Sequence, residues 1–312
     1  MPATVPRAVY YALASNAVVA LCKFAAAAYT NSGATLSEAV HSSADCLNQV
    51  LLITGRRAAH SGPDEEHPLG FGRETHFYAM LVALQFFLVG GLASIGIGAW
   101  RLWHRSGLDR PEIAVAVLFV SALVEGAALR ASILSIERKH RAGGLWRWFR
   151  ETGELETMLS IGEDTAALAG VLVSLTGTGL AALTGRPGFD ALGSIGVGLV
   201  MIATAVLSLR EIKSLIVGEA ARPSVRKAMR AWLDARPEIG HIVSLVVLRW
   251  SDSLLVAIQA ELAEHCDAEE LVRVIDRIEN AFQDAFPAAR WVFFEPELRE
   301  HGEHPLWSAC RR

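Results

Sequence analysis

Two residues inside an apolar stretch have the types and the spacing of metal ligands. His41 and Asp45 stand four residues apart in the stretch 34–55, with Glu38 and Asn48 about one helical turn before and after them. In a helix, side chains three or four residues apart lie on one face. An imidazole and a carboxylate one turn apart form half of a tetrahedral site for zinc or a similar ion. The alternative interpretation is a polar seam, in which the same side chains only hydrogen-bond neighbouring helices.

A second acidic pair lies in a later apolar stretch. Glu163 and Asp164 are adjacent, and no charged residue follows them before Arg186. Two neighbouring carboxylates cannot both face lipid, so at least one of them needs a cation or a proton. The alternative is that the pair marks the cytoplasmic start of a helix, where acidic side chains interact favourably with the helix dipole.

Three further charged residues lie within or at the start of apolar stretches. Lys23 is a cation that requires a carboxylate as charge partner, and Glu38 and Glu163 are both candidates. Glu125 stands alone in its stretch. For Asp190, which opens the last apolar stretch, we expect a structural role near the start of a helix.

The elements that must position these side chains are membrane-spanning helices. Of the 312 residues, 52% are hydrophobic and only 20% are charged, a balance typical of a bilayer-spanning bundle. The apolar stretches long enough to cross the hydrocarbon core cover residues 8–29, 34–55, 76–100, 112–136, 157–183 and 189–210. We therefore predict an all-α six-helix membrane bundle over residues 1–218.

The basic residues between these stretches predict the orientation of the bundle. The short segments on the N-terminal side contain Arg7, Arg56, Arg57, Arg73, Arg138, Lys139, Arg141, Arg147 and Arg150. Those on the other side contain Arg101, Arg105, Arg110 and Arg186. Because cytoplasmic loops carry an excess of Lys and Arg, both termini and the loop 137–156 are expected in the cytoplasm. We expect an integral protein of a bacterial plasma membrane.

From Glu219 onward the composition becomes that of a soluble domain. The spacing predicts an α-β-β-α-β order, which gives a small sheet with its helices on one face and a ferredoxin-like α+β fold. Helices are expected at 222–236 and 267–286, and strands at 241–250, 253–263 and 291–294. Because so short a domain has a modest core, we expect residues 219–312 to form a cytoplasmic regulatory and dimerisation domain.

Several function classes are not supported by the sequence. The net charge of −4 argues against a nucleic-acid partner. The four cysteines form no CxxC pair, so neither a zinc ribbon nor a disulfide framework is indicated. The glycine-rich run 193–198 lies inside an apolar stretch, where glycines serve close helix packing and not phosphate binding. No nucleophile and base stand at a spacing typical of hydrolysis, so we expect neither an enzyme nor a bound cofactor.

Several motifs together resemble those of the cation diffusion facilitator family. They are His41-x-x-x-Asp45, the loop 64–74, Asp164 six residues before Gly170, Gly218-Glu219, and Phe294-Glu295-Pro296-Glu297. The likeness covers nearly the whole chain. The acidic pair Glu163-Asp164, together with Asn16 and Lys23, resembles the subgroup around zinc transporter nine.

The resemblance implies a homodimer of six-helix protomers that exports a divalent metal ion in exchange for protons. It also implies a four-ligand site with two residues from each of the second and fifth spans. His41 and Asp45 match the first two ligand positions, and Asp164 matches the last. The remaining position is Ser160, where zinc-selective members commonly have a histidine.

The serine at this position leaves the metal ion less defined than the fold. A serine hydroxyl is a poor zinc ligand beside imidazole or carboxylate, and Glu163 or water could replace Ser160 as ligand. A site of one nitrogen and several oxygens accepts manganese, cobalt or iron(II) more readily. We expect the accessory loop site of the family to be weakened or absent. Asp64 and His67 match its first two positions, but Phe71 stands where metal-binding members have a second histidine.

We therefore expect a proton-coupled exporter of a divalent metal ion, with zinc as the first candidate. Its expected partners are membrane lipid, the metal ion, protons and a second copy of the chain. Transport of manganese, cobalt or iron(II) by the same mechanism is one alternative. The other is a metal-responsive membrane scaffold that does not transport, which the serine at position 160 and the eroded loop site make conceivable.

Overall fold

The computed structural model describes residues 7–135, 155–250, 253–263 and 267–297. Within these ranges, the side chains of residues 7–12, 135 and 155–160 lie outside the description. The basic loop that contributed to the predicted orientation and the side chain of Ser160 are therefore not covered. The chain divides into two compact units, residues 1–216 and 217–312.

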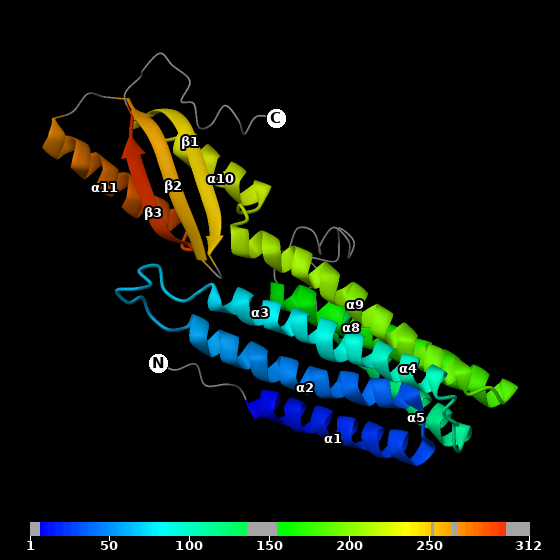
Figure 1. Cartoon of the computed structure of the whole chain (residues 1–312). Coiled ribbons are helices and arrows are strands. Elements are labelled where there is room, and N and C mark those ends of the chain that lie inside the picture. Colours follow the sequence, from blue (N-terminus) through cyan, green and yellow to red (C-terminus); the bar gives the residue numbers. More distant parts are fainter. Residues whose placement is uncertain (1–6, 136–154, 251–252, 264–266, 298–312) are drawn as a thin grey trace. The chain divides into compact units, whose positions relative to one another are not determined.

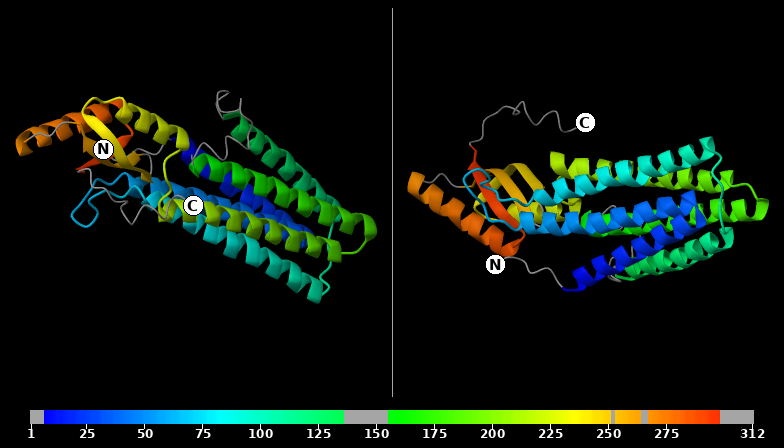
Figure 2. Two further views of the ribbon diagram at one scale, coloured as in Figure 1. Left: turned by 90° about the horizontal axis from the view of Figure 1, so that it is seen from above. Right: turned by 60° about the horizontal axis from the view of Figure 1, so that its bottom comes forward.

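The first unit consists of long helices that cover the apolar stretches. They are α1 (Arg7–Thr30), α2 (Gly33–Ala59), a continuous helical segment of α3 (Glu74–Gln85), η1 (Phe86–Leu92) and α4 (Ala93–Trp103), α5 (Pro111–Ser135), α8 (Leu155–Thr184) and α9 (Gly188–Val217). Figure 1 shows them side by side, and both views of Figure 2 show them running lengthwise along one another. The η1 segment is a π-helical stretch inside an otherwise α-helical rod.

In the described part of the chain, five helical segments are long and apolar enough to cross a membrane. They are Leu13–Thr30, Glu74–Trp103, Pro111–Leu134, Ile161–Thr184 and Gly188–Val217. The helix α2 does not meet the same criterion, because the polar residues of the candidate site lie in its middle. His41 and Asn48 are nevertheless buried and Asp45 is partly buried, since α2 packs against α1, α3, η1, α4 and α8.

The start of α2 is determined by its local sequence. Asn31 adopts a left-handed φ of 49° in the tight connection between α1 and α2, a conformation that asparagine tolerates better than most residues. Ser32 is the N-cap, and its hydroxyl accepts a hydrogen bond from the backbone N–H of Thr35. Arg56 and Arg57 in the last turn of α2 suit the negative end of the helix dipole. The short connection brings α2 back along α1.

Glycines allow α9 to approach the α3–α4 rod closely. A Cβ atom on Gly98 would lie 2.6 Å from the carbonyl oxygen of Ala191, and one on Gly198 would lie 2.6 Å from that of Gly91. Only glycine permits backbones to approach this closely, as at small-residue interfaces between membrane helices. The glycine-rich run of α9 therefore serves packing, as the sequence predicts.

The second unit contains a three-stranded sheet with two helices. Its elements are α10 (Pro223–Asp234), β1 (Ile239–Trp250), β2 (Ser253–Leu262), α11 (Ala268–Ala285) and β3 (Ala289–Pro296). The strand order is β1-β2-β3, with β1 and β2 antiparallel and β2 and β3 parallel. The order of elements is α-β-β-α-β, as predicted; the closer comparison with a ferredoxin-like arrangement stays a prediction.

One face of this sheet holds the core of the second unit. Alternate residues of β2, Val256, Ile258 and Ala260, are buried, whereas their neighbours along the strand are more exposed. Helices α10 and α11 cover these residues with Met229 and Phe282 respectively. Both helices therefore pack on the same face of the sheet.

Candidate metal site and its surrounding charges

His41 and Asp45 lie close together on α2, as their spacing predicts. The Nε2 atom of His41 is 3.6 Å from Oδ2 of Asp45, which is longer than a hydrogen bond. The imidazole is fully buried, and neither ring nitrogen has a hydrogen-bond partner among the described residues. Oδ1 of Asp45 also lacks a donor in that part of the chain. Because buried polar atoms normally have partners, this pair has the unused bonding capacity that a cation would satisfy.

Glu163 and Asp164 contact different helices. Nδ2 of Asn48 in α2 donates to Oε1 of Glu163, and the hydroxyl of Ser132 in α5 donates to Oδ2 of Asp164. Adjacent residues of a helix point about 100° apart, so the two carboxylates reach different neighbours. Since α8 begins at Leu155, the pair lies about two turns inside the helix, and the helix dipole does not account for it.

The carboxylates of α8 and the candidate ligands of α2, His41 and Asp45, are not gathered into one cluster. Among the described residues, no group of three His, Cys, Asp or Glu side chains could hold a metal ion. The way in which the antiparallel helices α2 and α8 are aligned explains this separation. Asn48 meets Glu163, and Glu38 accepts a hydrogen bond of 3.3 Å from Ser174. His41 and Asp45 lie on α2 between these contacts, whereas Asp164 contacts α5.

Lys23 is a buried cation with acidic partners. It is only 2% exposed, and its Nζ lies 3.4 Å from Oε2 of Glu38 and 2.9 Å from Oγ of Ser42. Of the two partners considered from the sequence, the structure places Glu38 beside Lys23, while Glu163 bonds to Asn48. The ammonium group therefore joins α1 to α2.

Glu125 of α5 is a second partner of Lys23 that the sequence reasoning missed. Its Oε1 lies 3.6 Å from Nζ of Lys23, and its side chain is 18% exposed. The available signal was its isolation, because a lone carboxylate in an apolar helix requires a cation or a proton. Two carboxylates thus face one ammonium group, and when all three are ionised the cluster carries one surplus negative charge.

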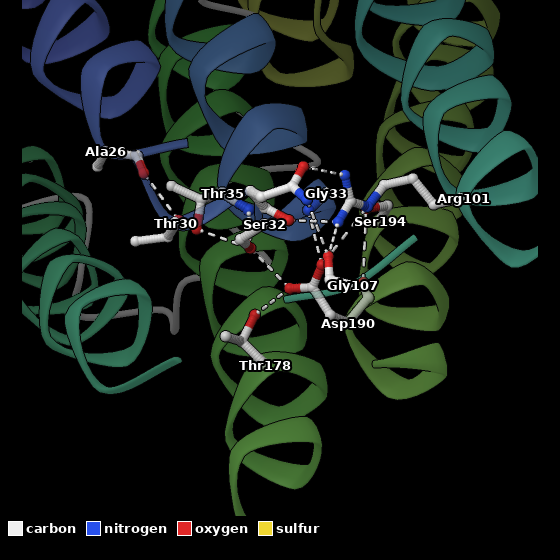
Figure 3. Close-up of polar contacts among 11 residues, drawn as sticks. Ala26, Thr30, Ser32, Gly33, Thr35, Arg101, Gly107, Thr178, Asp190 and Ser194 are labelled. Atoms are coloured by element: carbon white, nitrogen blue, oxygen red, sulfur yellow. Dashed lines mark hydrogen bonds and ion pairs between the residues drawn. The ribbon is translucent and has the colours of Figure 1, made fainter. Parts of the chain in front are cut away.

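The carboxylate of Asp190, at the start of α9, contacts residues at the start of α2 and in α4 and α8, as Figure 3 shows. Its Oδ2 accepts the backbone N–H of Gly33 at 2.6 Å, and its Oδ1 accepts the hydroxyls of Ser32 at 2.6 Å and Thr178 at 2.8 Å. Nε of Arg101 lies 3.9 Å from Oδ2. Asp190 stands in the first turn of α9, as the sequence predicts, but its carboxylate caps the start of α2.

The sequence of the helical unit determines which family the chain represents. Residues 9–217 match the sequence model described as the cation efflux transmembrane domain, which covers about two thirds of the 312 residues. The chain belongs to the cation efflux family. This result confirms the resemblance to the cation diffusion facilitators and identifies an integral membrane protein of a transporter family.

Individual relatives point to one part of the cation efflux family. Over 238 residues the chain is 29% identical to the mitochondrial proton-coupled zinc antiporter SLC30A9 of Homo sapiens, covering 76% of this chain and 42% of the relative. It is 31% identical over 220 residues to metal tolerance protein C4 of Arabidopsis thaliana, covering 69% of this chain and 47% of that protein. An uncharacterized transporter of Synechocystis is 25% identical over 217 residues, which are 66% of this chain and 62% of the relative. The chain therefore spans less than half of the length of the first two relatives.

The loop that could carry an accessory site of the cation efflux family forms a local turn. The backbone N–H of His67 donates to Oδ1 of Asp64 at 2.5 Å, and Nδ1 of His67 lies 3.2 Å from the same oxygen. This backbone hydrogen bond is the main cause that lowers the pKa of Asp64 below its usual value. The His67 ring packs against Phe71 with ring centroids 4.3 Å apart. The two residues that match the accessory site thus stabilise the turn that contains them.

Proposed function

We propose that this member of the cation efflux family exports a divalent metal ion, zinc as first candidate, in exchange for protons. The observation that carries the proposal is the buried imidazole of His41, whose two ring nitrogens have no hydrogen-bond partner among the described residues, beside Asp45. The ligands of the proposed site are His41, Asp45 and Asp164, with Glu163 in place of the serine at position 160. Lys23 acts as the charge partner that balances the surrounding carboxylates.

Proton coupling follows from the chemistry of these ligands. A metal ion binds only to a deprotonated imidazole nitrogen and to ionised carboxylates, so metal ions and protons compete for the same atoms. In an alternating-access cycle, protons from the external side displace the metal ion from His41 and Asp45. The separation between the α2 and α8 residues means that the helices must shift to assemble the complete site.

The orientation and assembly belong to the same proposal. The six long helical segments span the plasma membrane of a bacterium, with both termini in the cytoplasm, as the distribution of basic residues predicts. Residues 219–312 then form a cytoplasmic regulatory domain through which two protomers form a dimer. The relative SLC30A9 carries the words "proton-coupled zinc antiporter" in its name, which supports zinc and protons as the exchanged ions.

Transport measurements on single variants test the proposed function. Purified protein in proteoliposomes is expected to take up zinc when a proton gradient is imposed, and Asp45→Ala and Asp164→Ala are expected to abolish this uptake. Asp109→Asn, an exposed position in the connection before α5, is the control and should transport like the wild type. Undiminished uptake by either alanine variant would refute the site assignment.

Two alternative functions have specific support. The serine at position 160 favours an oxygen-rich site, which would transport manganese, cobalt or iron(II) by the same mechanism. The lack of an assembled three-residue cluster among the described residues favours a metal-responsive scaffold that does not transport. A pH-sensitive dye inside the proteoliposomes distinguishes a scaffold from a transporter, because a scaffold moves no protons whichever metal ion is added. A transporter moves protons, and the metal ion that gives the largest signal is its preferred substrate.

A further inference from the structure

Asn48 lies in the middle of the proposed site and has no assigned role. It follows Asp45 by three residues on α2, so His41, Asp45 and Asn48 form one stripe along the helix. The side chain is only 1% exposed. A buried carboxamide at this position requires partners for both of its ends, because it carries an oxygen acceptor as well as two N–H donors.

Only the nitrogen end of this carboxamide has such a partner. Nδ2 of Asn48 donates to Oε1 of Glu163, which fixes the orientation of the amide. Oδ1 of Asn48 is buried, and no hydrogen-bond donor in the described part of the chain reaches it. The oxygen therefore has free lone pairs in a place where unsatisfied acceptors are rare.

The unsatisfied atoms of the stripe share one property. They are the ring nitrogens of His41, Oδ1 of Asp45 and Oδ1 of Asn48. The oxygens can only accept, and a neutral imidazole always offers one nitrogen lone pair, so all three residues offer lone pairs that a cation can accept. Carboxamide oxygens are common ligands of hard cations such as calcium, and a carbonyl also suits manganese.

We propose that Asn48 is a ligand residue of the transport site and helps to determine which metal ion is bound. In this arrangement Oδ1 of Asn48 binds the ion together with His41 and Asp45, while Nδ2 holds Glu163 beside the same ion. One amide thus supplies an oxygen ligand and positions a carboxylate. It compensates for the serine at position 160 and makes the site richer in oxygen than a site with a second histidine.

The surroundings of Glu163 are consistent with this role. Glu163 lines a small cavity together with Thr204 and Ser208 of α9. Leu52 and Phe86 form part of the apolar lining.

This inference rests on the proposed function, and the experiment separates the two. Isothermal titration of the detergent-solubilised full chain with zinc and with manganese is performed on Asn48→Leu, Glu163→Gln and the double variant Asn48→Asp/Glu163→Gln. The double variant keeps an oxygen at position 48, a hydrogen bond between the two side chains and the same net charge. If Asn48 is a ligand, Asn48→Leu loses zinc affinity by about tenfold or more, whereas the double variant binds within a few-fold of the wild type.

Two results would overturn the inference. The first is Asn48→Leu with the affinity and the zinc-to-manganese preference of the wild type. The second is a double variant that binds no better than Glu163→Gln alone, since Asn48 would then only donate a hydrogen bond to the true ligand. Wild-type metal binding and transport by Asp45→Ala would instead refute the proposed site, and a wild-type protein that takes up no metal ion would refute the proposed function, whatever the result at position 48.

The matched control is Gln85→Leu on α3. Gln85 is also buried, its Nε2 donates to the carbonyl of Ala44 at 2.7 Å, and its Oε1 has no donor among the described residues. The control is expected to keep the zinc-to-manganese preference, because Gln85 lies outside the stripe on α2. A change in preference equal to that of Asn48→Leu would contradict the assignment of Asn48, and thermal unfolding verifies that each variant is folded.

Discussion

The backbone N–H of Gly33 donates to Oδ2 of Asp190 across 2.6 Å, so a residue of α9 caps the first turn of α2. The other carboxylate oxygen accepts the hydroxyls of Ser32 and Thr178. The helix α2 carries His41, Asp45 and Asn48. The carboxylate of Asp190 therefore holds in place the first turn of the helix that contains the candidate site. The relationship is a long-range equivalent of an N-cap.

Asp190→Asn is expected to lower the stability of the helical unit. An asparagine offers one acceptor oxygen and places an N–H group against donors, which leaves buried groups unsatisfied and costs about 1–3 kcal/mol. The change is measured as a lower midpoint of thermal unfolding in detergent. Glu65→Gln, which changes an exposed carboxylate in the loop before α3, is the control; equal midpoints for the two variants would contradict the structural role of Asp190.

Gly33→Ala is expected to disturb the same contact from the other side. A Cβ atom at position 33 would lie 2.9 Å from Oγ of Ser194 and would also collide with the side chain of Arg101. Overpacking of this kind costs about 1–3 kcal/mol. Gly62→Ala, where no atom lies within 4 Å of the added Cβ, should unfold like the wild type in the same assay.

Removal of the ammonium group of Lys23 is expected to be severe. Lys23→Met leaves Glu38 and Glu125 without their cation in the membrane interior, and breaking a buried ion pair costs about 3–5 kcal/mol. The double variant Lys23→Met/Glu125→Gln should regain part of this loss, because it removes one of the two uncompensated charges. Thermal unfolding of both variants tests this expectation. A double variant less stable than Lys23→Met would show that Glu125 is not a partner.

Ser160→His tests the ligand position that the family resemblance implies. If position 160 is the vacant fourth ligand, the histidine is expected to tighten zinc binding by about tenfold and to raise the preference for zinc over manganese. Isothermal titration with both ions measures the change. Thr165→His, at an exposed position on the same helix, is the control. Unchanged zinc affinity in Ser160→His would assign the fourth position to Glu163 or to another residue.

The surroundings of Glu279 in α11 predict that the stability of the second unit depends on pH. Burial raises the pKa of its carboxyl above the usual value, although the backbone N–H of Phe294 donates to Oε1 at 3.0 Å and acts in the opposite direction. A raised folded-state pKa means that the folded state loses stability as the pH rises above the pKa of the unfolded chain. Glu279→Gln keeps the acceptor and cannot ionise. The variant should therefore gain a degree or two in unfolding midpoint at about pH 8 and show little gain at about pH 4.

The opposite pH dependence would contradict this interpretation of Glu279. Asp284→Asn on the same helix is the control, because Asp284 is exposed and, unlike Asp276, is not one of the carboxylates that raise the pKa of Glu279. Its unfolding midpoint should follow that of the wild type across the same range of pH.

Local patterns in the sequence were sufficient for the helices and for the stripe on α2. The apolar stretches predicted α1, α2, the α3–α4 rod, α5, α8 and α9, because length and hydrophobicity are local properties of the chain. The face shared by His41 and Asp45 followed from the 3.6-residue period alone. In the second unit, alternating and helical spacings predicted each element of the α-β-β-α-β order.

Which side chains meet across helices was decided only by the tertiary structure. The bond from Asn48 to Glu163, the second carboxylate beside Lys23 and the capping of α2 by Asp190 join residues that are 115, 102 and 157 positions apart. Such pairs depend on the rotation and the sliding of each helix against its neighbours. Both are set by the packing of many small and apolar side chains, such as the glycines between α4 and α9, and no local period encodes them. The sequence by itself thus determined which residues could bind a metal ion, while the packing of the helices decided that Asn48 and Glu163 stand together and that Asp164 contacts α5.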